Sequence, residues 1–175
     1  MALTSQELLQ RHEATLAEFQ PLPSLLEIEP EKLARILIIT CADPRTIPEN
    51  MFNLQTGEAV VFRVPGGNAQ FLLEHVLSLD SLLHFKECII VQHTDCGATH
   101  FRDAKVKEGL RERAPDLKQQ IDGLSFGEIT GSLDENVRKS IDFLRASALV
   151  PEELKANTRG FVFDIKTGHL NEVKV

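Results

Sequence analysis

The sequence predicts an α/β fold, a single domain in which a mainly parallel central β-sheet is flanked by helices. Short apolar runs rich in branched side chains recur along the chain, and longer segments with apolar residues at helical spacing lie between them. The length of 175 residues suits one hydrophobic core. We therefore expect one domain over residues 1–175, of which residues 1–30 form an N-terminal helical arm.

The first predicted element is an amphipathic helix over residues 5–19. Thr4 and Glu7 form a capping-box pattern, and apolar residues recur at helical spacing from Leu9 onward. Two prolines, Pro21 and Pro23, end the helix. The pattern leaves open whether this helix packs on its own domain or on a partner subunit.

Three apolar runs, residues 36–39, 59–62 and 89–91, predict strands. They show almost no polar alternation, which is typical of strands buried on both faces of a parallel sheet. Residues 69–85 have apolar side chains at helical spacing and lie between the second and third runs, where a crossover helix is required. Strand and helix thus alternate, as in the α/β class.

The C-terminal third continues the pattern. Residues 134–147 predict a second long helix, residues 160–165 another strand, and Thr167-Gly168 a turn into a last short strand. Residues 105–118 mix charges of both signs and predict a solvated helix or loop.

Composition excludes several classes of function. The formal net charge of −7 and the absence of clustered Lys and Arg argue against a nucleic-acid partner. No run approaches the roughly 20 apolar residues of a membrane helix, and no signal-peptide or transit-peptide pattern is present. An odd count of three cysteines argues against a disulfide framework and favours metal or thiol chemistry in a reducing compartment. We expect a cytoplasmic protein with no membrane partner.

Three candidate metal ligands follow the ends of two predicted strands. The stretch around the first run, residues 35–40, ends directly on Cys41, and the stretch around the third, residues 88–92, ends directly on His93. Cys96 lies three positions after His93. If the two strands are neighbours, these side chains meet at the carboxyl edge of the sheet, where ligands bind in open parallel sheets. Thiolate and imidazole are the ligands that zinc prefers, and three protein ligands leave the fourth position open for catalysis. The sequence therefore predicts a catalytic Zn2+ site.

A carboxylate and a guanidinium lie next to this site. Asp43 and Arg45 follow Cys41 at spacings of two and four residues, so an extended turn directs both toward the metal. The carboxylate is suited to accept the proton of a zinc-bound hydroxide, and the guanidinium keeps it ionised. A carboxylate freed from its arginine would instead occupy the fourth zinc position and switch the enzyme off.

Two short motifs give a resemblance to a known family. CxDxR is present as Cys41-Ala42-Asp43-Pro44-Arg45, and HxxC as His93-Thr94-Asp95-Cys96. Together they resemble the signature of β-class carbonic anhydrases, in detail over residues 34–97. The resemblance implies zinc on Cys41, His93 and Cys96, an Asp43–Arg45 dyad, and a homodimer or higher homo-oligomer with active sites near the subunit interface. The implied reaction is hydration of carbon dioxide to bicarbonate by zinc hydroxide.

One segment departs from the family pattern beside the expected substrate pocket. The family commonly has an Arg-Asn-Ala-Gly-like stretch where this chain reads Arg63-Val64-Pro65-Gly66-Gly67-Asn68. We place Val64, Pro65, Gly66 and Gly97 at the pocket, where a more apolar wall suits a sulfur substrate. Carbonyl sulfide or carbon disulfide hydrolysis on the same site is therefore an alternative, as relatives of the fold show. A non-catalytic structural or sensory zinc protein is a second alternative.

Two further residues have simpler interpretations. Cys88 begins a strand opposite the active edge, and free cysteines are among the most buried residues, so we expect it in the core. His100 follows Cys96 closely and is suited either to relay protons at the mouth of the site or to an ordinary surface role.

Overall fold

The computed structural model describes residues 3–175, and the chain divides into two units, residues 1–32 and 33–175. The first unit contains helix α1 (Ser5–Thr15), which Thr4 and Glu7 cap as the pattern predicts. Three short 3-10 turns follow it: η1 (Leu16–Glu18), η2 (Leu25–Glu27) and η3 (Pro30–Lys32). The predicted helix over residues 5–19 is thus confirmed up to Thr15, and no residue of α1 is buried.

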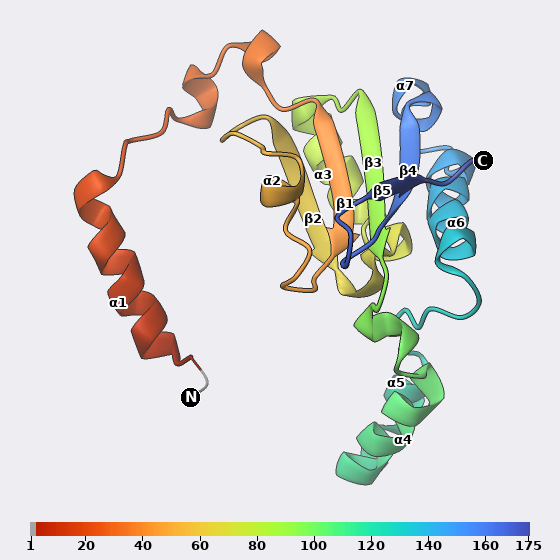
Figure 1. The fold of residues 1–175 in the computed structure, drawn as a ribbon. Coiled ribbons are helices and arrows are strands. Elements are labelled where there is room, and N and C mark those ends of the chain that lie inside the picture. Colours follow the sequence, from red (N-terminus) through yellow and green to blue (C-terminus); the bar gives the residue numbers. More distant parts are fainter. Residues whose placement is uncertain (1–2) are drawn as a thin grey trace. The chain divides into compact units, whose positions relative to one another are not determined.

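The second unit is built on a five-stranded sheet (Figure 1). In spatial order the strands are β2 (Ala59–Val64), β1 (Ile36–Cys41), β3 (Glu87–His93), β4 (Thr158–Phe163) and β5 (Leu170–Glu172). The first three pairings are parallel, and β5 pairs with β4 in the antiparallel direction. The α/β class and the mainly parallel sheet are therefore confirmed, and β1 and β3 are neighbours.

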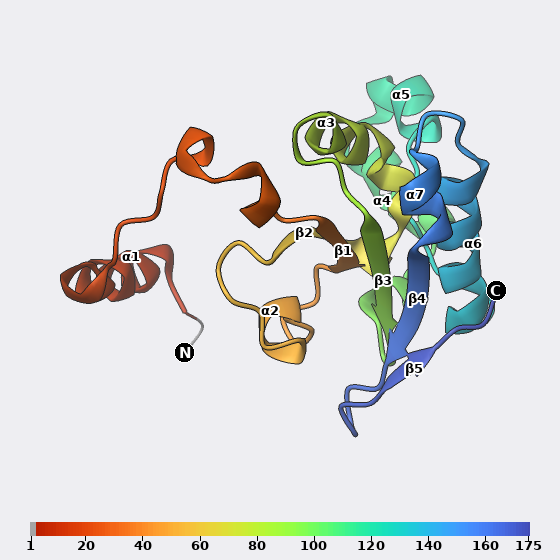
Figure 2. The ribbon, with the colours of Figure 1, turned by 90° about the horizontal axis from the view of Figure 1, so that it is seen from above.

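Two long helices cover one face of this sheet, α3 (Leu73–Leu83) and α6 (Leu133–Ala146) (Figure 2). Helix α6 begins at a Ser132–Glu135 capping box and lies within one residue of its predicted bounds. The predicted helix over residues 69–85 is instead divided into the 3-10 turn η5 (Ala69–Phe71) and α3. It ends early because His84 adopts a left-handed backbone conformation, with φ of 51°.

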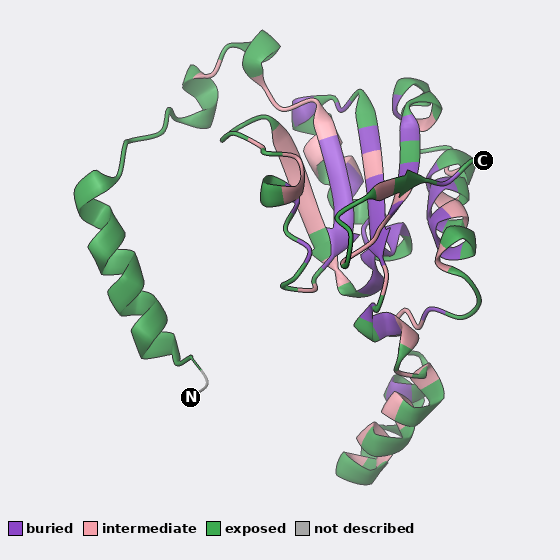
Figure 3. Ribbon diagram, in the orientation of Figure 1, coloured by how far each residue is buried: buried purple, intermediate pink, exposed green. Residues whose placement is uncertain are grey.

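The core lies between the sheet and these helices, and the most buried stretches are the central strands (Figure 3). Alternate residues of β1 and β3, such as Leu37, Ile39 and Ile90, pack against Val76 of α3 and Ile141 of α6, and all five are fully buried. Helix α6 approaches β4 closely, since a Cβ built on Gly160 would lie 2.2 Å from Cγ1 of Val137. This packing fixes the strand ends that bear the site.

The remaining elements are short or peripheral to the sheet. They are α2 (Pro48–Met51), η4 (Pro65–Gly67), η6 (Gly97–Thr99), α4 (Asp103–Arg113), η7 (Pro115–Leu117), α5 (Lys118–Asp122) and α7 (Glu152–Ala156). Helix α4 has no buried residue, as predicted for the charged segment, and with α5 it lies beyond the carboxyl ends of the strands (Figure 1). Within residues 3–175, no helix is both long enough and apolar enough to span a bilayer.

Candidate metal centre

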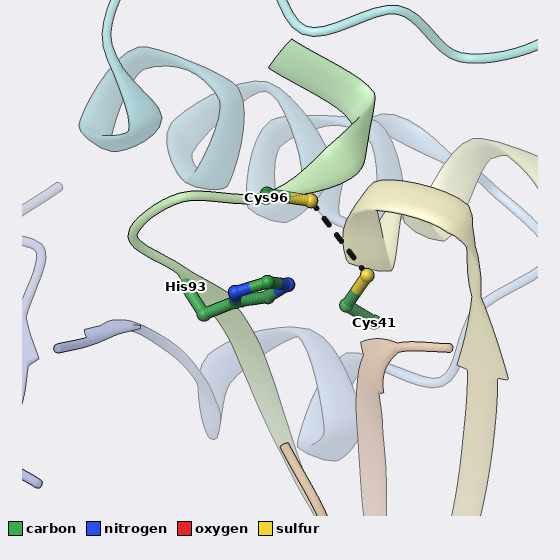
Figure 4. A group of neighbouring side chains, drawn as sticks. All are labelled: Cys41, His93 and Cys96. Carbon is green, nitrogen blue, oxygen red and sulfur yellow. Dashed lines mark hydrogen bonds between the residues drawn. The ribbon is translucent and has the colours of Figure 1, made fainter. Parts of the chain in front are cut away.

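Cys41, His93 and Cys96 converge at the carboxyl edge of the sheet (Figure 4). Cys41 is the last residue of β1 and His93 the last of β3, and the parallel register places Thr40 opposite Val91. The turn after His93 then brings Cys96 back toward Cys41. The three ligand atoms all lie within 4.8 Å of one another, so the structure brings together the three residues that the sequence singled out.

The spacing and protonation of these atoms suit a divalent metal ion. The two sulfur atoms are 3.7 Å apart, and tetrahedral zinc with bonds of about 2.3 Å would separate them by about 3.8 Å. The Nδ1 atom of His93 lies 2.9 Å from the carbonyl oxygen of Thr94, which only accepts, so Nδ1 has the proton. In the neutral imidazole the Nε2 atom then keeps its lone pair, and it is buried without a hydrogen-bond partner among the described residues.

The two thiols lie in a small apolar cluster with Ala98 and Ile129. The hydrogen bond from Cys96 lowers the pKa of the Cys41 thiol, which favours the thiolate form that binds metal. Cys88 is different: it is fully buried in the main core, and burial raises the pKa of its thiol to about 12. The prediction that Cys88 is a core residue is confirmed.

Asp43 and Arg45 form a close ion pair beside the ligands. The Nε and Nη2 atoms of Arg45 donate to the two carboxylate oxygens of Asp43 at 2.9 and 2.7 Å, and its backbone N–H donates to Oδ1 at 2.9 Å. These hydrogen bonds hold the pKa of the Asp43 carboxyl well below its usual range. Oδ2 of Asp43 lies 3.7 Å from Nε2 of His93, so the ionised carboxylate borders the metal centre.

Arg45 also binds a residue that sequence reasoning missed. Its Nη1 donates to Oδ2 of Asp95 at 2.7 Å, and its Nη2 donates to the Asp95 carbonyl oxygen at 2.9 Å. Asp95 lies between the ligands His93 and Cys96 and has a left-handed backbone, with φ of 55°. The only signal in the sequence was a carboxylate inside the HxxC motif.

Arg63 is a second residue that sequence reasoning left without a role. From β2, its guanidinium reaches the loop after β1 and donates to the carbonyl oxygens of Cys41, Asp43 and Thr46, at 3.3, 2.7 and 3.1 Å. One side chain therefore binds the backbone of the candidate metal ligand Cys41, of Asp43 and of Thr46 at the end of the loop. No sequence motif indicates this contact, because it depends on the parallel pairing of β1 with β2.

A cavity of about 260 Å³ opens beside Cys41. Pro65, Gly66 and Gly97 line it. Among the described residues Val64 is not one of its lining residues, because this side chain packs against the main core instead. The full lining is Cys41, Ala42, Asp43, Pro65, Gly66, Gly97, Ala98 and Phe101. Asp43 is its one charged member, so the wall is mostly apolar.

Comparison with known proteins agrees with this geometry. The profile of the family described as "Carbonic anhydrase" matches residues 36–170. The chain is 31% identical to "Beta-carbonic anhydrase 1" of Mycobacterium tuberculosis, over 85% of this chain and 86% of the relative. It is 27% identical to "Carbon disulfide hydrolase" of Acidianus sp., over 79% and 76%.

A solved carbonic anhydrase structure has the same fold over almost the whole length of this chain. The carbonic anhydrase from Glaciozyma antarctica superposes with a TM-score of 0.84 at 28% identity, covering 99% of this chain and 100% of that one. The matched region contains all three candidate ligands and all five strands except the last two residues of β5. The chain belongs to the β-class carbonic anhydrase family.

Proposed function

We propose that this protein is a zinc enzyme that catalyses the reversible hydration of carbon dioxide to bicarbonate. The observation that supports it most is the placement of the Asp43 carboxylate 3.7 Å from Nε2 of His93, beside a mostly apolar cavity. A purely structural metal site has no need of such a carboxylate. Membership of the β-class family supports the same reaction.

In this proposal Cys41, His93 and Cys96 hold the zinc ion. Zinc bound there supplies Lewis-acid chemistry, since it lowers the pKa of a water molecule so that a nucleophile for carbon is available near neutral pH. Two thiolates and one neutral imidazole balance the charge of the ion. Three protein ligands would leave a coordination position of the ion open for catalysis.

The neighbouring residues orient the reacting groups. Asp43 is kept ionised by Arg45, so it is an acceptor only and would orient a hydrogen-bond donor placed beside it at the site. The pair also fixes the carboxylate itself, because both of its oxygens are bound. The apolar cavity wall at Pro65, Ala98 and Phe101 suits carbon dioxide, which is small and has no net dipole.

A second reaction deserves a direct test, namely the hydrolysis of carbonyl sulfide or carbon disulfide on the same site. The similarity to a carbon disulfide hydrolase favours it, and so does the apolar lining that includes Pro65. Both substrates are linear triatomic molecules with a carbon atom open to attack. The same ligands and the same dyad would serve either reaction.

We also propose that the chain works as a homodimer or higher homo-oligomer. In the N-terminal unit the large apolar side chains are strongly exposed, with Leu9 at 64%, Leu22 at 63% and Leu26 at 96%. Exposed apolar surface of this kind is typical of an interaction site. Light scattering coupled to size-exclusion chromatography tests this, and a monomer at micromolar concentration would contradict it.

The reaction is tested by measuring turnover on carbon dioxide and on carbonyl sulfide side by side, with zinc content quantified. We expect stopped-flow carbon dioxide hydration to dominate, and Cys41→Ser to abolish it. Dominant sulfide release would establish the hydrolase instead. Full zinc content with neither activity would indicate a structural or sensory zinc protein.

A further inference from the structure

Arg45 binds two loops at once. Its guanidinium holds Asp43 in the loop after β1 and Asp95 in the loop after β3. The first loop follows the candidate ligand Cys41 directly, and the second lies between the candidate ligands His93 and Cys96. Four of its five N–H groups are used in these contacts: two on the Asp43 carboxylate, one on the Asp95 carboxylate and one on the Asp95 carbonyl.

The geometry of the Asp43–Arg45 ion pair would be poorly fixed if the arginine had no second partner. The Arg45 side chain is 47% exposed. Ion pairs of long exposed side chains are weak, because solvent screens them and because fixing the side chain costs rotamer entropy. A second carboxylate on the other side of the guanidinium removes that freedom, and Asp95 is placed to do so.

The backbone at Asp95 is strained in a way that serves this contact. A residue other than glycine rarely adopts a positive φ, and Asp95 has φ of 55°. This conformation directs both the carbonyl oxygen and the carboxylate of Asp95 to the same guanidinium. Strain that is retained next to a metal centre points to a role in positioning.

We propose that Asp95 is a positioning residue that locks Arg45 in the orientation in which it binds both carboxylate oxygens of Asp43. The role rests on the proposed function, because it matters for turnover only if the Asp43–Arg45 pair serves the reaction. Asp95 acts through Arg45 and does not touch the substrate cavity. Its other titratable neighbour is His100, whose Nε2 lies 3.4 Å from Oδ1, the oxygen that Arg45 leaves free.

Asp95→Gly distinguishes the effect of the carboxylate from the effect of the backbone strain. Glycine adopts a positive φ without cost, so this variant relaxes the loop while removing the acceptor. We expect unchanged zinc content, an unchanged or raised melting temperature, and kcat lowered about tenfold, as for residues that orient groups at a metal site. KM should change little. Asp95→Asn, which also tolerates a positive φ, should lose a similar factor.

A spectroscopic readout tests the positioning without any turnover. The Nε–H of Arg45 donates to Asp43, so its proton should exchange slowly with water and give a resolved ¹H–¹⁵N signal. In Asp95→Gly this signal should broaden or disappear. An unchanged signal, or a kcat within twofold of the wild type, would overturn the proposal.

Two controls and a double mutant show whether Asp95 affects turnover through Arg45. Asp122→Asn removes another exposed aspartate that binds an arginine, Arg111, and should leave kcat unchanged. His100→Ala removes the second neighbour of Asp95 but keeps Arg45 in place, and should leave the Arg45 signal unchanged. In an Arg45→Gln background, Asp95→Gly should cost nothing further. An equal loss in both backgrounds would show that Asp95 acts independently of Arg45.

The outcomes distinguish this proposal from the proposed function. If Asp43→Asn keeps full carbon dioxide hydration, the role of the pair in catalysis fails, whereas the Arg45 signal still tests the role of Asp95. If Asp43→Asn loses activity while Asp95→Gly keeps both activity and signal, only the inference about Asp95 is wrong.

Discussion

The Sγ atoms of Cys41 and Cys96 lie 3.7 Å apart although the residues are 55 positions apart in the sequence. The contact exists because β1 and β3 are parallel neighbours whose carboxyl ends meet, and the turn after His93 returns the chain toward β1. Two buried thiols and an imidazole nitrogen that has no hydrogen bond within residues 3–175 form a set of donors that a metal ion would satisfy together.

Removal of one of these donors should release the metal. We expect Cys41→Ser and His93→Ala to bind far less than one zinc per chain, because only two strong ligands remain. Cys88→Ala is the matched control, since this thiol is fully buried in the core. It should keep its zinc and lose only stability. Metal analysis after dialysis measures the zinc content of the ligand variants and of the control. Loss of zinc from Cys88→Ala would contradict the assignment of Cys41, His93 and Cys96 as the ligands.

Loss of the carboxylate should separate metal binding from turnover. Asp43→Asn keeps the size of the side chain but removes the charged acceptor that Arg45 holds. We expect full zinc content and a fall of about 100-fold in carbon dioxide hydration, the scale of a positioned acid–base group. Stopped-flow assays at matched zinc content measure it. Wild-type turnover in this variant would remove Asp43 from the mechanism.

The fold and the three candidate ligands could be predicted because their signals are local. Apolar runs without alternation predicted the parallel strands, and both Cys41 and His93 stand where those runs end. The helix boundary near Leu72 was missed, since the periodicity of apolar residues continues through a backbone break. Periodicity reports which face is buried and does not report a local change of backbone conformation.

The Arg63 contact should hold the loop after β1 in place. Arg63→Gln removes the donors to the carbonyl oxygens of Cys41, Asp43 and Thr46, so we expect zinc to dissociate several times faster into a chelator. The control is Arg159→Gln, which removes an exposed arginine that pairs with Glu172 on the edge strand β5. Equal rates of zinc release from Arg63→Gln and Arg159→Gln would contradict the role of Arg63 in holding the loop.

Gly67 should not tolerate a side chain. Its φ is 62°, and a Cβ there would lie 3.0 Å from the carbonyl oxygen of Val91 and 3.3 Å from the backbone nitrogen of Cys41. We expect Gly67→Ala to lower the free energy of unfolding by about 1–3 kcal/mol. Urea unfolding measures the change.

Gly109 provides the matched control for that substitution. It lies in α4 with nothing within 4 Å of a built Cβ. Gly109→Ala should therefore raise the free energy of unfolding by about 0.5–1 kcal/mol, the helix-interior difference between the two residues. Equal effects at both positions would contradict the close approach at Gly67.

The contacts of Arg63 and Asp95 could not be predicted from the sequence. The Arg63 contact joins β2 to the loop after β1, whereas the Asp95 contact joins the loops after β1 and β3. The distances are set by the strand order and, at Asp95, also by a positive φ. The residues that line the cavity could likewise be predicted only in part from the sequence. Pro65 lines it as expected, but Val64 points to the core and Phe101 takes part from a segment with no recognisable motif.

The central claim is that one zinc ion on Cys41, His93 and Cys96 enables carbon dioxide hydration, and a zinc titration tests it most directly. The metal-free protein, prepared with a chelator, is reconstituted stepwise while zinc content and stopped-flow hydration are measured on the same samples. We predict that activity rises in proportion to bound zinc and saturates at one ion per chain, with no recovery in Cys41→Ser. Full activity without zinc, or hydration at the buffer background with one zinc bound, would contradict the claim.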